Sequence, residues 1–298
     1  MTPTNISTGR FAPSPTGPLH FGSIAAALAS YLDARSRSGR WLLRIDDLDA
    51  GRSRPQAIRQ ILEDLAGLGL EWDAGVYYQS QHLELYLQAL AELRRQGRVY
   101  PCACTRRDSG EGIYPGTCRQ GLPSGRTARS LRIRVDDREI RFQDHLQGPC
   151  GQVLADSCGD FIIQRADGYF AYHLATVIDD HEQGVTEVVR GCDLLDSTPR
   201  QIFLRQCLGL ADPDYLHIPL VTGHLGLKLS KQNHARRVDT SQPGAVLCAA
   251  LQHLGQNPPQ PLRQSSVSEV LSWALEHWNR GSLPPCETLP LASLGLQM

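Results

Sequence analysis

The segment from Arg10 to Ser23 carries the first side chains that could bind a charged ligand. It reads Arg-Phe-Ala-Pro-Ser-Pro-Thr-Gly-Pro-Leu-His-Phe-Gly-Ser, which predicts a short strand, a stiff loop and a helix start. Unpaired backbone N–H groups and the helix dipole at a helix start favour an anion such as phosphate. We expect His20 to donate to a phosphate oxygen and Gly22 to let a nucleotide approach the backbone. A turn in which His20 only caps the helix is the alternative, because short motifs have many false positives.

Positive charge is carried almost entirely by arginine in this chain, with two exceptions. Lysine and arginine together number 30, and the only lysines are Lys228 and Lys231, in the segment Lys-Leu-Ser-Lys-Gln. An ammonium group is a compact point charge, unlike the planar guanidinium. Their closeness indicates a segment that requires a compact ammonium, although drift in a lysine-poor sequence would leave the same pattern.

Three carboxylates follow a strand predicted at residues 41–45. The run Arg-Ile-Asp-Asp-Leu-Asp places Asp46, Asp47 and Asp49 just beyond the end of that strand. Such a cluster can hold a substrate ammonium group. A solvated loop beside a helix start, where acidic residues are also favourable, is the other interpretation.

Arg190 ends a strand predicted at residues 185–189. An arginine at the carboxyl edge of a parallel sheet faces the usual ligand crevice, and its planar fork matches a carboxylate. Tyr172 lies within an apolar stretch from Tyr169 to Ile178. From the residues alone, the default interpretation places Tyr172 in the core and Arg190 on the surface.

Cys102, Cys104 and Cys118 lie within seventeen residues of a segment that is rich in arginine and glycine. Three thiolates there suit a structural zinc ion that holds together a loop without a core. Three free buried thiols are the alternative. By chemistry alone, the fourth ligand is open among Asp108, Glu111, His145 and Cys150.

The first segment and the lysine pair resemble the two signature motifs of class I aminoacyl-tRNA synthetases. Residues 10–23 are similar to the HIGH signature in its Phe-Ala-Pro-Ser-Pro-Thr-Gly form, which occurs in the glutamyl and glutaminyl group, and residues 228–232 resemble the KMSKS signature. From Gly9 to about Leu254 the chain resembles the glutamyl-queuosine tRNA(Asp) synthetase family of stand-alone catalytic cores. Only 67 residues follow Lys231, too few for the anticodon-binding region of a full-length glutamyl enzyme.

The resemblance implies an enzyme of the ligase type that activates L-glutamate with ATP and Mg²⁺. It would then transfer glutamate to the queuosine of tRNA(Asp). His20, Lys228 and Lys231 would be catalytic, and His20, Gly22 and Lys231 would bind ATP. The implied glutamate-binding residues are Arg10, Phe11, Ala12, Pro13, Ser14, Asp46, Tyr172 and Arg190.

Two details of the implied sites concern single residues. Asp46 stands where glutamyl enzymes have a glutamate, so its carboxylate lies about one methylene back and could reach the substrate ammonium through water. The resemblance also implies that Tyr114, between the second and third cysteines, is the fourth zinc ligand. Two rival functions stay open: a compact glutamyl-tRNA synthetase that charges a tRNA 3′ end, and a non-catalytic module that binds glutamate or RNA.

The residues between these motifs alternate between predicted strands and helices. This alternation predicts a parallel sheet with crossover helices, and the resemblance implies a Rossmann-type α/β catalytic domain. Strands are expected at 8–11, 41–45 and 185–189, and helices at about 20–32, 55–65, 80–97, 198–209, 245–254 and 267–278.

Two of these helices carry more specific expectations. Ser53 is expected to be the N-cap of the helix that begins near Pro55. In the helix at 80–97, the apolar spacing predicts one face made of Leu83, Tyr86, Leu87 and Leu90.

The chain is expected to divide into four parts. Residues 1–100 and 161–240 predict the two halves of the catalytic domain, the second with the KMSKS-like loop. Residues 101–160, with short strands near 130–135 and 139–142, predict a zinc-binding, acceptor-type insertion. Residues 241–298 predict a short helical C-terminal region.

Charge is distributed unevenly along the chain. The formal net charge is -1 and the sequence pI about 6.8, which excludes a wholly basic nucleic-acid binder. Between Arg94 and Arg141, however, 12 arginines stand against five acidic residues, a local net charge of +7. Such a face would attract RNA through its phosphates.

Several properties of the whole sequence indicate where in the cell the protein is found. Nine cysteines, an odd number, argue against a disulfide framework. No apolar run approaches the roughly 18 residues of a membrane span. The first residues also lack the layout of a signal peptide. We therefore expect a cytoplasmic protein without membrane partners, and we expect it to be a monomer.

Overall fold

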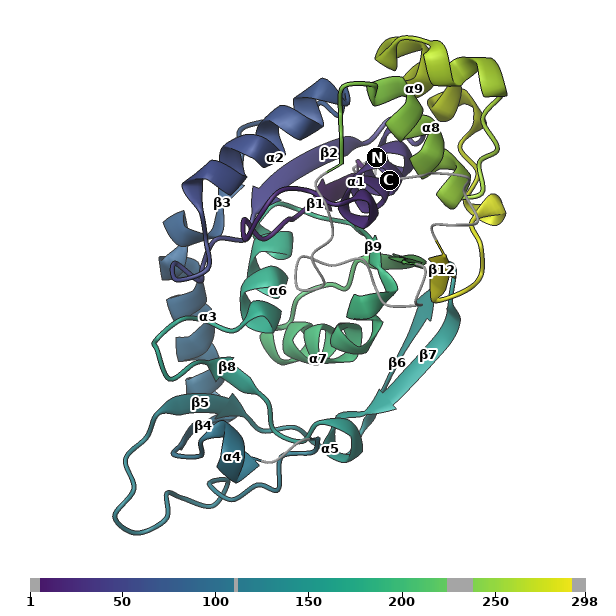
Figure 1. Ribbon diagram of the computed structural model, residues 1–298. Helices are drawn as coiled ribbons and strands as arrows, with labels where there is room; N and C mark the ends of the chain where they lie inside the picture. The colour runs from purple at the N-terminus through teal and green to yellow at the C-terminus, as the bar shows by residue number, and fades with distance from the viewer. Residues whose placement is uncertain (1–5, 110–111, 224–237, 291–298) are drawn as a thin grey trace, which may run out of the picture.

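A parallel sheet with helices on both faces organises the protein (Figure 1). The computed structural model describes residues 6–109, 112–223 and 238–290. Seven strands form the main sheet in the order β3-β2-β1-β9-β10-β6-β7, and every neighbouring pair is parallel except β6 and β7. Its strands are β1 (Thr8–Phe11), β2 (Arg40–Ile45), β3 (Tyr77–Tyr78), β6 (Glu139–Asp144), β7 (Gly148–Val153), β9 (Glu187–Gly191) and β10 (Asp214–Ile218). The predicted α/β class with a parallel sheet is confirmed.

Apolar side chains that alternate along the central strands feed two cores, one on each face of the sheet. On β9, Val189 packs into one core and Val188 into the other, as the two-residue period of a strand requires. The first core is covered by α1 (Phe21–Arg35), α2 (Pro55–Gly67), α8 (Pro243–His253) and α9 (Val267–His277). The second is covered by α3 (Leu83–Arg95), α6 (Tyr172–Glu182) and α7 (Thr198–Leu208).

Helix boundaries follow local chemistry, with one correction. α7 ends where Gly209 adopts φ 68°, a left-handed C-cap that suits glycine. α2 starts at Pro55 as predicted, but its N-cap is Arg54, without a side-chain cap. The prediction that Ser53 caps this helix is therefore wrong. The Ser53 hydroxyl donates instead to the carbonyl of Asp47 and closes the preceding loop.

The buried face of α3 is rotated from the predicted one. Tyr86 and Leu90 are buried as expected, together with Ala89 and Leu93. Leu83 and Leu87 are 46% and 48% exposed, so their predicted burial is wrong. Ala89 and Leu93 continue the stripe of Tyr86 and Leu90 at helical spacing, and this stripe faces α6 and α7.

The stretch predicted as one insertion, 101–160, contributes to two separate sheets. A small antiparallel sheet contains β4 (Val99–Cys102), β5 (Ser130–Ile133) and β8 (Ile162–Gln164), and the short α4 (Arg106–Ser109) follows β4. This unit lies apart from the main sheet, at the lower left of Figure 1. In contrast, β6 and β7 continue the main sheet and lead into α5 (Leu154–Ser157).

The C-terminal part packs onto the main sheet unit through α1. Helices α8 and α9 contact α1, and their apolar residues Leu247, Leu251 and Val270 join its core. β12 (Thr288–Pro290) then pairs in parallel with β11 (Leu220–Thr222), so the end of the described chain contacts the strand that follows β10. Among the described residues, no helix has the length and apolar character needed to cross a membrane.

Candidate functional site

A cavity of about 470 Å³ opens at the carboxyl ends of β1, β9 and β10. β1 and β9 are neighbours in the sheet, and their connections lead to opposite sides, which is the switch point where α/β sheets usually bind ligands. Its lining includes nine predicted site residues: Arg10, Phe11, Ala12, Pro13, Ser14, His20, Gly22, Tyr172 and Arg190. Asp46 is not among the lining residues. Lys228 and Lys231 lie outside the described residues.

His20 caps α1, as the alternative interpretation expected, and it also lines the cavity. Its Nδ1 accepts a hydrogen bond of 3.2 Å from the backbone N–H of Ser23, and its Nε2 lies 3.0 Å from the Ser23 hydroxyl. A Cβ atom on Gly22 would lie 3.3 Å from the His20 ring, so a side chain there would crowd the imidazole. Glycine at this position therefore leaves room for the imidazole ring.

Below the cavity, two arginines share one buried carboxylate. Asp180 Oδ1 accepts from Arg44 Nη1 at 2.6 Å and from Arg10 Nε at 3.2 Å. Burial opposes ionisation, but Arg10, Arg44 and Arg205 hold the pKa of Asp180 well below its ordinary value. These pairs fix Arg10 at 4% exposure and join β1, β2 and α6. The Arg10 guanidinium is thus held in the cavity wall by a permanent anion.

Asp46 is engaged in the same cluster. Its carboxylate accepts from Arg44 Nε at 2.8 Å, and its side chain is only 7% exposed. Its backbone N–H donates to the carbonyl of Pro13, which ties the loop after β2 to the loop after β1. Asp46 thus supports the wall of the cavity without lining it.

Asp179 lies next to this cluster and is held by neutral donors. Its carboxylate accepts from Tyr86, Gln79 and Tyr77 at 2.7, 2.6 and 3.0 Å. Burial raises the pKa of Asp179 to about 6, although Arg44 and the hydroxyl of Tyr86 act in the opposite direction. Asp179 and Asp180 are consecutive carboxyls with opposite pKa shifts.

Arg190 is buried, at 5% exposure, and lines the cavity at the end of β9. Its Nη2 donates to the Thr198 hydroxyl at 2.8 Å, and its Nε donates to His217 at 3.0 Å. Gly191 follows it, and a Cβ atom there would meet Asp193 at 2.7 Å and Leu220 at 2.9 Å. The default interpretation of Arg190 as a surface charge is therefore wrong.

Tyr172 is exposed, in contrast to the buried Arg10 and Arg190. It begins α6 and is 37% exposed, and its ring contacts His173 edge to face. Because Tyr172 lines the cavity, its placement in the core is also wrong.

A second candidate site, distant from the cavity in the sequence, joins the three cysteines. The sulfur atoms of Cys102, Cys104 and Cys118 lie within 4.8 Å of one another. The Tyr114 hydroxyl oxygen lies 3.5 Å from Cys102 Sγ and 3.6 Å from Cys104 Sγ. The backbone N–H of Cys118 donates to this oxygen at 3.0 Å. Burial opposes ionisation of Cys102, but Tyr114, the Cys104 N–H and Arg132 lower its pKa to about 7.

These distances match those of a tetrahedral metal site. With metal–sulfur bonds of about 2.3 Å and a metal–oxygen bond of about 2.0 Å, tetrahedral geometry gives about 3.8 Å between sulfurs and about 3.5 Å from sulfur to oxygen. Cys104 Sγ and Cys118 Sγ are 3.7 Å apart. The three cysteines are thus compatible with a structural metal. The other described candidates for the fourth ligand have different surroundings. Asp108 accepts from Thr105 and pairs with Arg126, His145 lies near Asp214, and Cys150 belongs to β7. Glu111 lies outside the described residues.

The arginine-rich stretch is partly neutralised by its own neighbours. Ion pairs join Arg95 to Glu92, Arg119 to Asp160, Arg126 to Asp108, Arg138 to Asp136 and Arg141 to Glu139. Arg132 lies over the Tyr114 ring, with its guanidinium carbon 3.6 Å from the ring centre. Asp108, Asp136 and Glu139 are already subtracted in the net charge of +7. Glu92 and Asp160 lie outside residues 94–141, so these two lower the local charge available to an RNA further.

Three groups that shape the cavity were not assigned a role from the sequence. Arg44 and Asp180 form its buried charge pair, and His217 contacts Arg190. A signal for Arg44 was present, because it is charged within a strand that otherwise reads as buried. The partner of Arg190 carried no such signal, since His217 lies 27 residues later on the next strand.

Comparisons with known proteins point to one family of catalytic domains. Residues 6–109 and 119–257 match the family model of tRNA synthetases class I (E and Q), catalytic domain. The chain is 49% identical over 286 residues to the Glutamyl-Q tRNA(Asp) synthetase of Dechloromonas aromatica, covering 93% of this chain and 95% of the relative. It is 50% identical over 291 residues to the protein of that name from Methylococcus capsulatus, covering 97% and 96%.

Solved structures resemble the fold at lower identity. The glutamate-tRNA synthetase of Elizabethkingia anophelis superposes with a TM-score of 0.78 at 24% identity, covering 94% of this chain and 67% of that one. A glutamate tRNA ligase from Elizabethkingia meningosepticum gives the same TM-score and identity, covering 96% and 67%.

Proposed function

Because the chain belongs to the class I tRNA synthetases of the glutamate and glutamine type, we propose that it activates L-glutamate with ATP and transfers it to the queuosine of tRNA(Asp). The acceptor is inferred from its relatives, which are named Glutamyl-Q tRNA(Asp) synthetase and match it over nearly their whole length. The enzyme is then a ligase, and we expect it to act as a monomer.

The observation that supports this proposal best is the joint lining of one cavity. Arg10, His20, Tyr172 and Arg190 come from three distant parts of the chain and meet at the switch point of the sheet. Two buried guanidinium groups suit an anionic substrate, while the start of α1 suits a phosphate.

In the first step, the α-carboxylate of glutamate attacks the α-phosphorus of ATP. A bond from carboxylate oxygen to phosphorus forms, the bond to the bridging oxygen breaks, and pyrophosphate leaves with its electron pair. Arg10 and Arg190 would orient the amino acid, with Tyr172 against it. His20 and Lys231 would stabilise the developing phosphate charge, with Lys228 assisting, so catalysis comes from position and charge. Mg²⁺ would enter with the ATP phosphates and neutralise part of their charge.

In the second step, a hydroxyl of the queuosine cyclopentene-diol attacks the activated carbonyl. An ester bond forms, the mixed anhydride bond breaks, and AMP leaves. No nucleophilic side chain is needed.

The cysteine cluster would hold one structural zinc ion through Cys102, Cys104, Cys118 and the Tyr114 oxygen. The ion would supply cross-linking rather than chemistry. The cluster is a small core of its own, formed by these residues with Tyr100, Ala103 and Leu122. A zinc ion would stabilise so small a core, because the core has few apolar contacts of its own.

The deciding experiment is the transfer of labelled glutamate to tRNA(Asp) with and without queuosine. We expect an ester only on the queuosine-containing tRNA. Charging of tRNA(Glu) at its 3′ end would favour the compact glutamyl-tRNA synthetase. Absence of glutamate-dependent ATP–pyrophosphate exchange would favour a non-catalytic binding module.

A further inference from the structure

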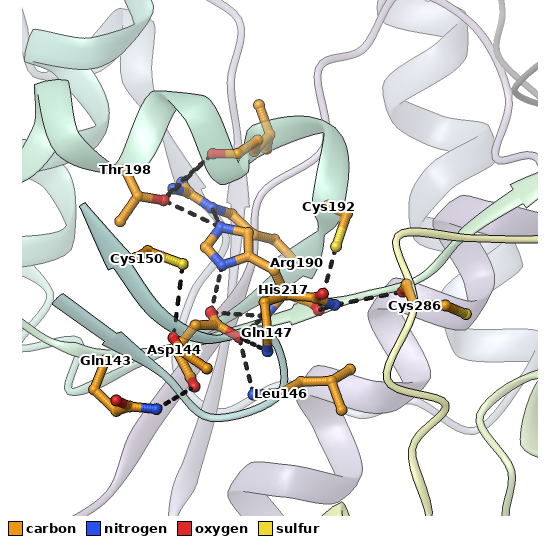
Figure 2. Close-up of polar contacts among 12 residues, drawn as sticks. Gln143, Asp144, Leu146, Gln147, Cys150, Arg190, Cys192, Thr198, His217 and Cys286 are labelled. Carbon is orange, nitrogen blue, oxygen red and sulfur yellow. Dashed lines mark hydrogen bonds and ion pairs between the residues drawn. The ribbon is translucent and has the colours of Figure 1, made fainter. Parts of the chain in front are cut away.

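Two side chains outside the cavity lining, Asp144 and His217, form a chain of hydrogen bonds that ends on Arg190 (Figure 2). Arg190 on β9 and His217 on β10 are direct partners across the two parallel strands. Arg190 Nε donates to His217 Nε2 at 3.0 Å, and Asp144, at the end of β6, lies 2.6 Å from His217 Nδ1. Asp144 and His217 are both 0% exposed.

Asp144 is a fully engaged acceptor. Its Oδ1 accepts from the backbone N–H groups of Leu146 and Gln147 at 2.9 and 2.8 Å. Its Oδ2 accepts from His217 twice, through the backbone N–H at 3.1 Å and through the ring at 2.6 Å. The carboxylate cannot rotate without breaking several of these bonds, so its position relative to the ring is fixed.

This arrangement determines the tautomer of His217. An ionised carboxylate only accepts, so Nδ1 carries the ring proton. Nε2 is then a bare acceptor and can take the N–H of Arg190. If the proton were on Nε2 instead, two donors would face each other. The carboxylate of Asp144 thus acts on Arg190 through the ring.

The guanidinium of Arg190 is held from two directions. Its Nε donates to His217. Its Nη2 donates to the Thr198 hydroxyl and, at 3.3 Å, to the carbonyl of Leu194. Nη1 is buried, and within the described part of the chain it has no hydrogen-bond partner. Since Arg190 lines the cavity, Nη1 is the donor left for a ligand. Buried donors are rarely left unsatisfied without such a reason.

We propose that Asp144 and His217 are positioning residues, which hold Arg190 so that its remaining donor is presented to the carboxylate of the amino-acid substrate. The inference rests on the proposed function, since it takes glutamate as the ligand of Arg190. Neither residue touches the substrate. Their effect is to fix one planar orientation of the guanidinium before glutamate binds, which lowers the ordering cost of binding.

The test is ATP–pyrophosphate exchange by the purified full-length chain carrying Asp144→Asn. The Asn oxygen can accept from the backbone N–H groups while its NH₂ donates to His217 Nδ1. The ring proton then moves to Nε2, where it faces the N–H of Arg190 and removes the acceptor. We expect the KM for glutamate to rise at least tenfold, with the KM for ATP within about twofold of wild type. Thr198→Val removes the hydroxyl that accepts from Nη2 and that lies 3.2 Å from His217 Nε2, and it leaves Asp144 in place. It should also raise the KM for glutamate selectively.

Gln147→Met is the matched control. Gln147 lies in the same turn, but its side chain donates to the backbone carbonyls of His217 and Cys286 at 2.9 and 3.4 Å and leaves the ring alone. We expect its KM for glutamate to stay at the wild-type value. An equal rise of the KM for glutamate in Gln147→Met would mean that glutamate binding depends on the turn after β6 and not on the Asp144 carboxylate.

A double-mutant cycle separates positioning from a general structural role. In an Arg190→Leu background, Asp144→Asn should cause no further change in the KM for glutamate. An undiminished effect in that background, or equal losses for glutamate and ATP, would overturn the inference. Wild-type enzyme without glutamate-dependent exchange would instead overturn the proposed function. Melting temperatures of all variants show whether each one is folded.

Discussion

Arg44 donates a hydrogen bond of 2.6 Å to Asp180, although the two residues are 136 positions apart, and both are buried. The first belongs to β2 and the second to α6. Their pairing brings a strand from the first half of the sheet against a helix from the second half. The same Asp180 oxygen also holds Arg10, so the floor of the cavity depends on one carboxylate. The neighbouring Asp179 allows the electrostatics of this region to be tested.

Asp179→Asn should change how stability depends on pH. The pKa of Asp179 is raised from 3.8 to about 6 in the folded protein, so the folded state binds this proton more tightly than the unfolded state. Stability therefore falls as pH rises from about 4 to about 6, by at most about 3 kcal/mol from this group. The variant should lack this decline in urea unfolding at several pH values.

Asp179→Asn keeps the local hydrogen bonds. The side-chain amide of Gln79 can rotate so that its oxygen accepts from the new NH₂, and the remaining Asn oxygen still accepts from Tyr77 and Tyr86. Glu63→Gln, which removes an exposed carboxylate, is the control and should keep the wild-type slope. If the slope of Asp179→Asn also equals that of wild type, the carboxyl is ionised normally in the folded state.

Lys231→Ala should reduce adenylate formation by roughly 10² to 10³-fold, the usual loss for one preorganised donor at a developing charge. Single-turnover formation of glutamyl-adenylate measures this directly. Arg237→Ala removes a cation from the same segment and serves as the control. Near-wild-type exchange by Lys231→Ala would exclude the lysine from the mechanism.

Arg190→Leu should weaken glutamate binding by roughly 10 to 100-fold, because a charged hydrogen bond in a buried site is lost. The KM for ATP should change much less. The comparison of both KM values in the exchange assay tests this. Arg200→Leu, a cation of α7 that is not among the lining residues, is the control. Equal losses for the two substrates would make Arg190 a structural residue.

Removal of zinc should loosen the small antiparallel sheet. We expect about one zinc ion per chain by atomic emission in the purified protein, and a lower melting temperature after chelation. Tyr114→Phe should release zinc to a competing chelator at least tenfold more readily, because an oxygen ligand is lost. Cys150→Ser should retain the ion. Unchanged zinc affinity in Tyr114→Phe would exclude the phenol as a ligand.

Much of the architecture could be predicted from local pattern. The strand and helix alternation, the glycine after α7 and the helices after residue 240 depend on neighbours a few residues away. The buried face of α3 could not be placed correctly, because Tyr86 and Leu90 belong to two overlapping helical stripes. One continues through Leu83 and Leu87 and the other through Ala89 and Leu93, and only packing against α6 and α7 chooses between them.

The candidate site divides in the same way. Arg10, His20 and Gly22 lie within one segment, so their proximity is nearly dictated by sequence. The support of Arg190 by His217 and Asp144 depends on which strands become neighbours, and β6 joins β10 from a segment predicted as an insertion. Asp46 shows the reverse case, since a carboxylate in a plausible position is already engaged by Arg44.

The parallel pairing of β11 with β12 makes the far end of the described chain a structural neighbour of the ligand cavity. Leu220 and Val221 line that cavity, and their strand has its partner in residues 288–290. Shortening the chain before residue 288 would therefore leave one wall without its lateral support. We expect a shortened enzyme to bind its substrates more weakly even though every residue that touches them is retained.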